Sequence, residues 1–267
     1  MVQPAPAGPW YGDEPESSSA PLSPNPAAGI PRRSTTGVHQ QADPVRATQD
    51  RVADMPDPLP VLDALHSTPA RRYLSSTPIA DEIVRDLLDA AIRGPSGGNS
   101  QRWAWIVVRD AATKAPIASF YREGWEKNYG SRRDQILSTP GAMSPASFHA
   151  AEHLANHLEE APVWIFPVLL GAARSRDPRL GSSIYGAVQQ LMLAARAYGI
   201  GSTLTTLYAA HESEVRTLLG LPHDALTMAL IPLGYPNRGR WAEPKRRPLD
   251  EVMFEERYRT SEAPATS

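Results

Sequence analysis

The segment that most restricts how this chain folds is GPSGGNSQRW, residues 94–103. It follows an amphipathic run over residues 79–93 and precedes a short apolar run over residues 105–108. This order predicts a helix, a tight turn and a strand in succession. Three glycines and a proline suit a backbone that turns sharply and comes close to a flat or anionic group. Taken alone, the segment is explained more simply as a structural turn.

The composition of the chain narrows the class of protein. Its 267 residues suffice for one large domain or two small ones, and 27 basic against 29 acidic residues give a formal net charge of -2. That balance gives no reason to expect nucleic acid or an anionic membrane as a partner. The absence of cysteine excludes disulfides, thiolate nucleophiles and cysteine-bound metal centres. No apolar run approaches the roughly 18 residues of a membrane helix and no signal peptide is recognisable, so we expect a cytoplasmic protein.

The first sixty residues differ from the rest of the chain. They hold 12 of the 27 prolines but only two aromatic residues, Trp10 and Tyr11. Such a segment buries too little apolar surface to offset the entropy that is lost on ordering. We therefore expect residues 1–58 to be a disordered, proline-rich tail and residues 59–267 to form the folded domain. The alternative is an arm that wraps around a partner subunit through Trp10 and Tyr11.

Periodicity and turn residues divide the folded part into helices and strands. Apolar residues at helical spacing predict helices over residues 60–67, 79–93, 115–129, 150–160, 183–198 and 212–219. Short apolar runs predict strands over residues 104–109, 163–170 and 225–233. Residues 131–148, which are interrupted by Pro140, Gly141 and Pro145, are expected to form a mobile lid. Because helices and strands mix without a regular βαβ rhythm, the pattern favours an α+β sandwich.

Three further segments carry residues that suit chemistry. Residues 67–73, STPARRY, place Arg71 and Arg72 before the helix over residues 79–93. Residues 199–207, GIGSTLTTL, contain a Gly-x-Gly but lack the third glycine of a dinucleotide-binding signature. Residues 243–252, EPKRRPLDEV, contain three consecutive cations. Each segment also has a simpler explanation. Arg71 and Arg72 could be surface charges, residues 199–207 could be a helix cap that leads into a loop, and residues 245–247 could be a solvated basic face.

In this order and at these distances the segments resemble the FMN-dependent nitroreductase family, over roughly Leu62 to Arg257. The resemblance implies an α+β fold built as a three-layer α/β/α sandwich. It also implies an intertwined homodimer with FMN at the interface between the subunits. The implied activity is that of an oxidoreductase: NAD(P)H passes hydride to flavin N5, and an electron-poor acceptor such as a nitroaromatic or a quinone then receives the electrons in a ping-pong cycle.

The resemblance gives Arg71 the central electrostatic role. Aligned on Tyr73, the last basic residue of the family's arginine-rich stretch falls on Arg71, and a fixed cation beside flavin N1 favours the reduced, anionic ring. Ser67 and Thr68 stand where the family often has an arginine pair, so Ser67 supplies only a hydroxyl to the phosphate. Pro69 likewise replaces a frequent serine.

The other family segments supply the remaining contacts to the cofactor. The loop from Pro95 to Asn99 matches one that packs over the flavin of the neighbouring subunit, with Ser96 and Gly97 touching the ring and Asn99 and Gln101 holding the loop's shape. The backbone N–H of Thr206 corresponds to a donor to flavin N5. Lys245 and Arg247 correspond to a pair that clamps the phosphate. The implied cofactor-binding residues are Ser67, Arg71, Arg72, Pro95, Ser96, Gly97, Asn99, Thr205, Thr206, Leu207, Lys245 and Arg247.

Several alternatives stay open at this point. His149, His153 and His157 share one helix face but have no fitting fourth ligand, so we expect no metal site, and either a surface stripe or a contact to substrate. No Gly-x-Ser-x-Gly motif supports a hydrolase. Other enzymes of the same fold are a peptide or azoline dehydrogenase, a reductive dehalogenase and the flavin-fragmenting enzyme of cobalamin synthesis. A non-catalytic FMN storage protein is the remaining alternative.

Overall fold

The computed structural model describes residues 59–141, 143–173, 175 and 177–258. The expected disordered tail, residues 1–58, lies outside these residues, so the division at residue 59 stays a prediction. The α-helices of the described part are α2 (Val61–His66), α3 (Asp81–Ala91), α4 (Ala111–Asn128), α5 (Arg133–Ser138), α6 (Pro145–His157), α7 (Tyr185–Ala197) and α8 (Glu212–Leu218). Its strands are β1 (Trp103–Val108), β2 (Val163–Leu169), β3 (Gly201–Ser202), β4 (Leu226–Thr227) and β5 (Ile231–Gly234). None of these helices is long and apolar enough to cross a membrane.

The strand β2 is the centre of a five-stranded sheet in the order β1-β2-β5-β3, and β4 also pairs with β2. β1 runs antiparallel to β2 along its whole length, with Trp103 opposite Leu169. β5 lies on the other side of β2, with Val163 opposite Leu233, and β3 pairs with β5. The pairings in this sheet are antiparallel, so the expected α+β class is confirmed and a doubly wound parallel sheet is not formed.

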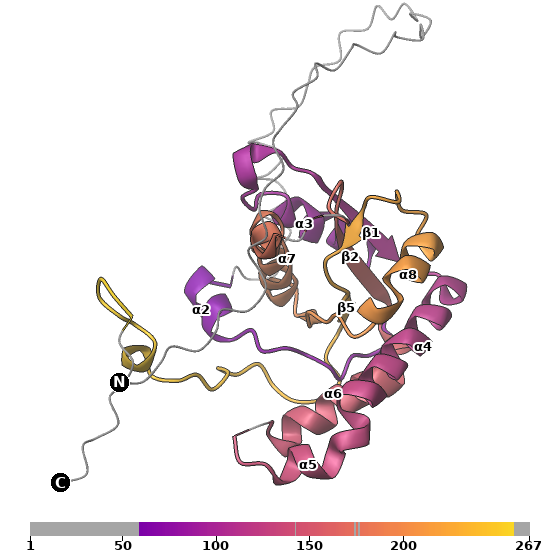
Figure 1. Ribbon diagram of the computed structural model, residues 1–267. Helices are drawn as coiled ribbons and strands as arrows, with labels where there is room; N and C mark the ends of the chain where they lie inside the picture. Colours follow the sequence, from indigo (N-terminus) through magenta and orange to yellow (C-terminus); the bar gives the residue numbers. More distant parts are fainter. Residues whose placement is uncertain (1–58, 142, 174, 176, 259–267) are drawn as a thin grey trace, which may run out of the picture. The chain divides into compact units, whose positions relative to one another are not determined.

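The two faces of β2 belong to two separate hydrophobic cores. Along the strand every side chain is buried, and successive side chains point to opposite faces of the sheet. Trp164 and Phe166 pack with apolar residues of α4, α6 and α8. Ile165 and Leu169 pack with apolar residues of α3 and α7. Helices therefore cover both faces of the sheet, as Figure 1 shows, and the expected three-layer α/β/α sandwich is confirmed.

The stretch expected as one strand over residues 225–233 is divided into β4 and β5, so its predicted continuity is wrong. The break faces Pro167 of β2, which has no N–H to donate to a neighbouring strand. The Met228 N–H donates to the Pro167 carbonyl at 2.8 Å, but the Met228 carbonyl accepts from the Tyr185 hydroxyl at 3.0 Å. Leu230 instead exchanges two backbone hydrogen bonds with Thr205, at 2.8 and 3.1 Å. This exchange ties the segment after β3 to the sheet.

Residues 131–148 contain more helix than the sequence predicts. α5 lies within them, and α6 begins at Pro145 because the Ser144 hydroxyl accepts the Ser147 N–H at 3.2 Å and a proline fits the first helical turn. An ion pair between Arg133 and Glu152 joins α5 to α6. Residue 142 lies outside the described residues. The sequence predicts no helix within residues 131–148, so α5 and the first turn of α6 correct that expectation, and the mobile lid stays a prediction.

Candidate functional site

The segment that begins at Arg71 lies against the edge of the sheet. The Arg71 N–H donates to the Ser202 carbonyl at 2.8 Å, and the Ser75 N–H donates to the Tyr235 carbonyl at 2.8 Å. Gly201 allows this close approach, because a Cβ at that residue would stand 2.7 Å from the Arg71 Cβ. The sheet thus holds the two adjacent arginines, Arg71 and Arg72, at a fixed place.

The guanidinium of Arg71 is anchored on the loop that follows β5. Arg71 is only 8% exposed, and its Nη2 and Nη1 donate to the carbonyls of Arg238 and Arg240 at 2.7 and 2.9 Å. Its guanidinium also lies 5.0 Å from the centre of the Trp241 ring. Burial, and to a lesser extent the charge of Arg196, lower the pKa of Arg71. Arg71, the cation that the sequence assigns to the flavin ring, therefore donates at least two of its hydrogen bonds to backbone carbonyls.

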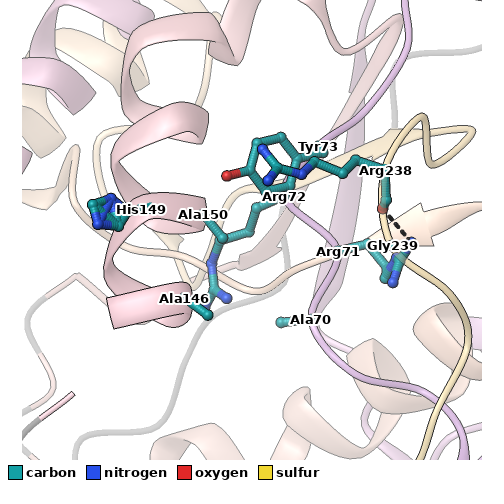
Figure 2. Close-up of a pocket in the computed structure, with 9 residues that line it drawn as sticks. All are labelled: Ala70, Arg71, Arg72, Tyr73, Ala146, His149, Ala150, Arg238 and Gly239. Atoms are coloured by element: carbon teal, nitrogen blue, oxygen red, sulfur yellow. Dashed lines mark hydrogen bonds between the residues drawn. The ribbon is translucent and has the colours of Figure 1, made fainter. Parts of the chain in front are cut away.

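A pocket of about 630 Å³, here called the arginine pocket, opens beside this anchor (Figure 2). Figure 2 shows the Arg72 side chain extending toward Ala146 and Ala150 of α6, whereas Arg71 turns toward the 238–240 loop. The lining includes three arginines and a histidine but no carboxylate, so the pocket suits an anionic group. It is lined by Ala70, Arg71, Arg72, Tyr73, Ala146, His149, Ala150, Arg238 and Gly239.

A second pocket of about 250 Å³, here called the threonine pocket, shares Arg72 with the first. One wall is the segment of residues 203–207, and the others come from α4 and α6 and from the loops beside them. Thr205 connects two of these walls, because its hydroxyl donates to the Tyr121 hydroxyl at 3.0 Å. Burial raises the pKa of Tyr121. Besides Arg72 and residues 203–207, the lining consists of Tyr121, Trp125, Tyr129, Met143, Ala151 and Leu154.

The backbone donors of residues 205 and 206 differ in what they bind. The Thr205 N–H donates to the Leu230 carbonyl at 3.1 Å. Within the described residues the Thr206 N–H donates to no carbonyl or side chain, although Thr206 lines the threonine pocket. This leaves one peptide N–H available for a ligand at the residue that the sequence selects.

The loop of residues 95–99 lines neither the arginine pocket nor the threonine pocket. Its backbone is held by the Gly97 N–H, which donates to the Ser183 hydroxyl at 3.2 Å, and by the Ser96 hydroxyl, which accepts the Gln101 N–H at 3.1 Å. Asn99 adopts a left-handed conformation with φ 51°, a region that asparagine tolerates better than most residues. The hydroxyl of Ser96 thus takes part in shaping the loop, a role that the sequence gives to Asn99 and Gln101. Pro95, Gly97 and Asn99 are exposed.

The predicted phosphate residues are brought together only in part. Ser67 donates its hydroxyl hydrogen to the Asp63 carbonyl at 2.6 Å, so that hydrogen is already engaged. Lys245 and Arg247 are exposed and line neither pocket. Glu243, in the same segment, lies 3.5 Å from His66, the residue before Ser67.

One cation of the site has no counterpart in the sequence-based prediction. The Arg238 guanidinium lies 4.9 Å from the Tyr73 ring centre. His153, on α6, stacks on the same Tyr73 ring and also on His157, with ring centroids 4.3 Å apart in both pairs. Burial and then the charge of His157 lower the pKa of His153, opposed by Glu160, so neutral imidazole is favoured. Spacing along the chain identifies the histidines, but no local pattern links Arg238 to Tyr73.

Comparison with known proteins gives the family. The model of the Nitroreductase family matches residues 66–235. This range contains Arg71 and Arg72 of the arginine pocket and residues 203–207 of the threonine pocket. The chain belongs to the nitroreductase family. The resemblance drawn from the sequence is thereby confirmed, and so is the nitroreductase-like fold.

Relatives of this family member carry several names. An NADH dehydrogenase of Thermus thermophilus is 30% identical over 217 residues, which are 73% of the chain and 97% of that protein. Iodotyrosine deiodinase 1 of Rattus norvegicus is 29% identical over 189 residues, 68% of the chain. The match covers 64% of that deiodinase, somewhat less than two thirds of its length.

Solved structures show the same fold at lower identity. The NADPH:FMN oxidoreductase from Vibrio harveyi, complexed with NAD+, aligns with a TM-score of 0.57 and 18% identity over 76% of this chain and 79% of that chain. A nitroreductase with bound FMN from Desulfitobacterium hafniense aligns with a TM-score of 0.56 and 18% identity over 73% of this chain and 98% of that chain.

Proposed function

We propose that this chain is an FMN-dependent NAD(P)H oxidoreductase that acts as a homodimer and reduces an electron-poor acceptor. The observation that carries the proposal is the meeting of two features at Arg72: an acid-free pocket lined by three arginines, and a wall whose Thr206 N–H is available. An acid-free cationic pocket suits a phosphate and an electron-rich ring edge. A peptide N–H suits a ring nitrogen.

The residues of the site fit FMN in size and in chemistry. Ligand sites commonly enclose about 300–1,000 Å³, and the arginine pocket offers about 630 Å³ before the threonine pocket is included. Aromatic side chains of Tyr121, Trp125 and Tyr129 line the threonine pocket, where a flat ring gains contact area. When bound, FMN supplies two-electron transfer between a nicotinamide donor and the acceptor.

Each predicted site residue then has a definite task. Arg71 and Arg72 place positive charge near the ring and favour its reduced state, Arg72 by direct contact because its side chain lines both pockets. The Thr206 N–H would donate to the edge of the bound ring, and Thr205 and Leu207 would hold that donor in place. Ser67, Lys245 and Arg247 are assigned to the phosphate. No side-chain acid or base is required of the protein.

The homodimer is supported by apolar surface that one chain leaves uncovered. Large exposed apolar patches usually mark protein interfaces. In this chain large apolar side chains near both ends of the described residues are exposed, Tyr258 to 76% and Val61 to 68%. The resemblance implies that the loop of Pro95, Ser96, Gly97 and Asn99 would pack over the flavin of the partner subunit. The residues concerned are Val61, Leu62, Leu65, Leu249, Val252, Met253, Phe254 and Tyr258.

Reductive dehalogenation is the second candidate function. It is favoured by the iodotyrosine deiodinases among the relatives, of which the rat protein is 29% identical. The two functions share the cofactor and differ in the acceptor, which would be a halogenated phenol in place of a nitroaromatic or a quinone. A cytoplasmic location stays a prediction from the sequence.

Purified protein supplied with FMN tests the proposal. We expect a flavin spectrum that NADH or NADPH bleaches without oxygen, and a return of colour when a nitroaromatic or a quinone is added. Bleaching reversed only by a halogenated phenol would support the dehalogenase. Bound flavin that neither nicotinamide reduces would contradict the oxidoreductase and support a storage protein, and a protein that binds no flavin would contradict every version.

A further inference from the structure

Two guanidiniums share one indole ring beside the site. Arg196, in the last turn of α7, lies 4.2 Å from the Trp241 ring centre, and Arg71 lies 5.0 Å from the same centre. Arg196 also donates to Ser67, from Nη2 to the hydroxyl at 3.3 Å and from Nε to the carbonyl at 3.4 Å. Three separate segments of the chain therefore meet at Trp241.

This pair of cations has no acidic partner. Among the described residues no carboxylate forms an ion pair with Arg71 or Arg196, and Glu243, two residues beyond Trp241, pairs with His66. Like charges held close together are unfavourable, and they are stabilised by an anion that binds between or beside them. The charge of Arg196 lowers the pKa of Arg71, which records the same repulsion.

The position of Arg196 coincides with a gap in the expected phosphate site. Ser67, which the sequence-based prediction assigns to the phosphate, and Thr68 carry no charge, and the Ser67 hydroxyl hydrogen is bound to the Asp63 carbonyl at 2.6 Å. Arg196 brings a guanidinium to within 3.3 Å of that same hydroxyl from a different element. From Trp241 the chain reaches Lys245 in four residues, a span of at most about 14 Å.

We infer that Arg196 is a phosphate-binding residue of the flavin site and replaces the charge that Ser67 and Thr68 do not supply. The inference rests on the proposed function, because it concerns the phosphate of FMN. In this arrangement Trp241 orients the guanidinium by stacking, and Ser67 accepts two of its hydrogens, one at the hydroxyl and one at the carbonyl oxygen. Nη1 of Arg196, which donates to no group of the described chain, is the donor left for the ligand.

Binding of two flavins that differ only in the phosphate tests the inference. Apoprotein is titrated with FMN and with riboflavin, followed by quenching of flavin fluorescence. For Arg196→Gln we expect FMN affinity to fall roughly 10- to 100-fold, as for the loss of a charged hydrogen bond. Riboflavin affinity should change less than about twofold, because riboflavin carries no phosphate. Arg196→Lys, which keeps the charge but loses the fork, should give an intermediate loss of FMN affinity.

Controls separate the possible outcomes. Arg93→Gln removes an exposed arginine that pairs with Asp89 at the end of α3, and it should bind both flavins like the wild type. Inorganic phosphate should compete with FMN and not with riboflavin on the wild-type protein, and it should compete more weakly on Arg196→Lys, which tests Arg196 even if Arg196→Gln does not fold. Unchanged FMN affinity in folded Arg196→Gln, or an equal loss for both flavins, would overturn the inference alone. Failure of the wild type to bind either flavin would overturn the proposed function and the inference with it.

Discussion

A Cβ at residue 124 would stand 1.9 Å from the carbonyl oxygen of Leu207. The helix α4 and the segment of residues 203–207 therefore meet backbone to backbone, and only glycine permits this contact. Thr206 immediately precedes Leu207, so the position of its available N–H depends on the small size of Gly124. A residue without a side chain near the C-terminal end of α4 thus controls a wall of the threonine pocket.

Gly124→Ala should damage both stability and flavin binding. The methyl group forces the Leu207 backbone to move, and overpacking of this kind typically costs about 1–3 kcal/mol. Denaturant unfolding and FMN titration measure the two effects. Gly130→Ala is the matched control, because its Cβ would meet only the flexible carboxylate of Glu126. Flavin affinity equal to that of the wild type in Gly124→Ala would show that the Thr206 donor is not placed by this contact.

Replacing Arg72 should change the potential of the flavin more cleanly than replacing Arg71. Arg72→Gln removes a charge that lines both pockets, and we expect the two-electron midpoint potential to fall by roughly 30 mV or more, which corresponds to about 1.4 kcal/mol. Arg71→Gln should lower the potential as well, but also the melting temperature, since the Arg238 and Arg240 carbonyls lose their charged donor. Redox titration and thermal unfolding separate the effects. An unchanged potential in both variants would remove the tuning role from this pair.

The basic run near the C-terminal end of the described chain should govern retention of the cofactor. Lys245→Ala combined with Arg247→Ala should yield folded protein that is largely free of FMN, because each charged contact contributes about 1.5–3 kcal/mol. Flavin content after purification, measured by absorbance, gives the result. Arg246→Ala serves as the control, since this cation lies between the two. Full flavin occupancy in the double variant would disprove the assignment.

Lys114 should make the stability of the protein depend on alkaline pH. Its Nζ donates to the Ala161 and Pro162 carbonyls at 2.6 and 3.1 Å, and burial lowers its pKa from 10.5 to about 8. Between these values the unfolded chain binds more protons than the folded one, so the free energy of unfolding should rise as pH increases from 8 to 10.5. Urea unfolding over this interval measures the rise. Lys114→Met should lack it, and an identical slope in both proteins would contradict the assigned cause.

The layers of the fold can be predicted from the local sequence pattern, but the interruption between β4 and β5 cannot. The uniformly apolar run over residues 163–170 identifies a buried strand because every residue needed for that conclusion lies within it. The division of residues 225–233 depends on Pro167, which lies far away in the sequence and only becomes its neighbour through pairing. The helix predicted over residues 150–160 begins earlier, at Pro145, and its first turn was missed because its cap residues, Ser144 and Pro145, also resemble those of a loop.

The site follows the same division. Order and spacing of segments single out Arg71 and Thr206, and the structure places both beside pockets. The loop carbonyls that hold the Arg71 guanidinium, and the Arg196 side chain that shares Trp241 with it, come from distant segments with no motif of their own. A single sequence carries no signal for such neighbours, since they are created by the packing of α7 and of the chain after β5 against residues 67–73.

The central place of β2 has a consequence for how the protein comes apart. Alternate side chains of this one strand complete the hydrophobic cores on both faces of the sheet. If either helical layer detached, one set of β2 side chains would be exposed to solvent and the strand that supports the other core would be weakened. Its amide hydrogens should therefore be among the last to exchange with solvent. The helices on the two sides should melt together in a single cooperative transition, and the flavin should be released in that same event.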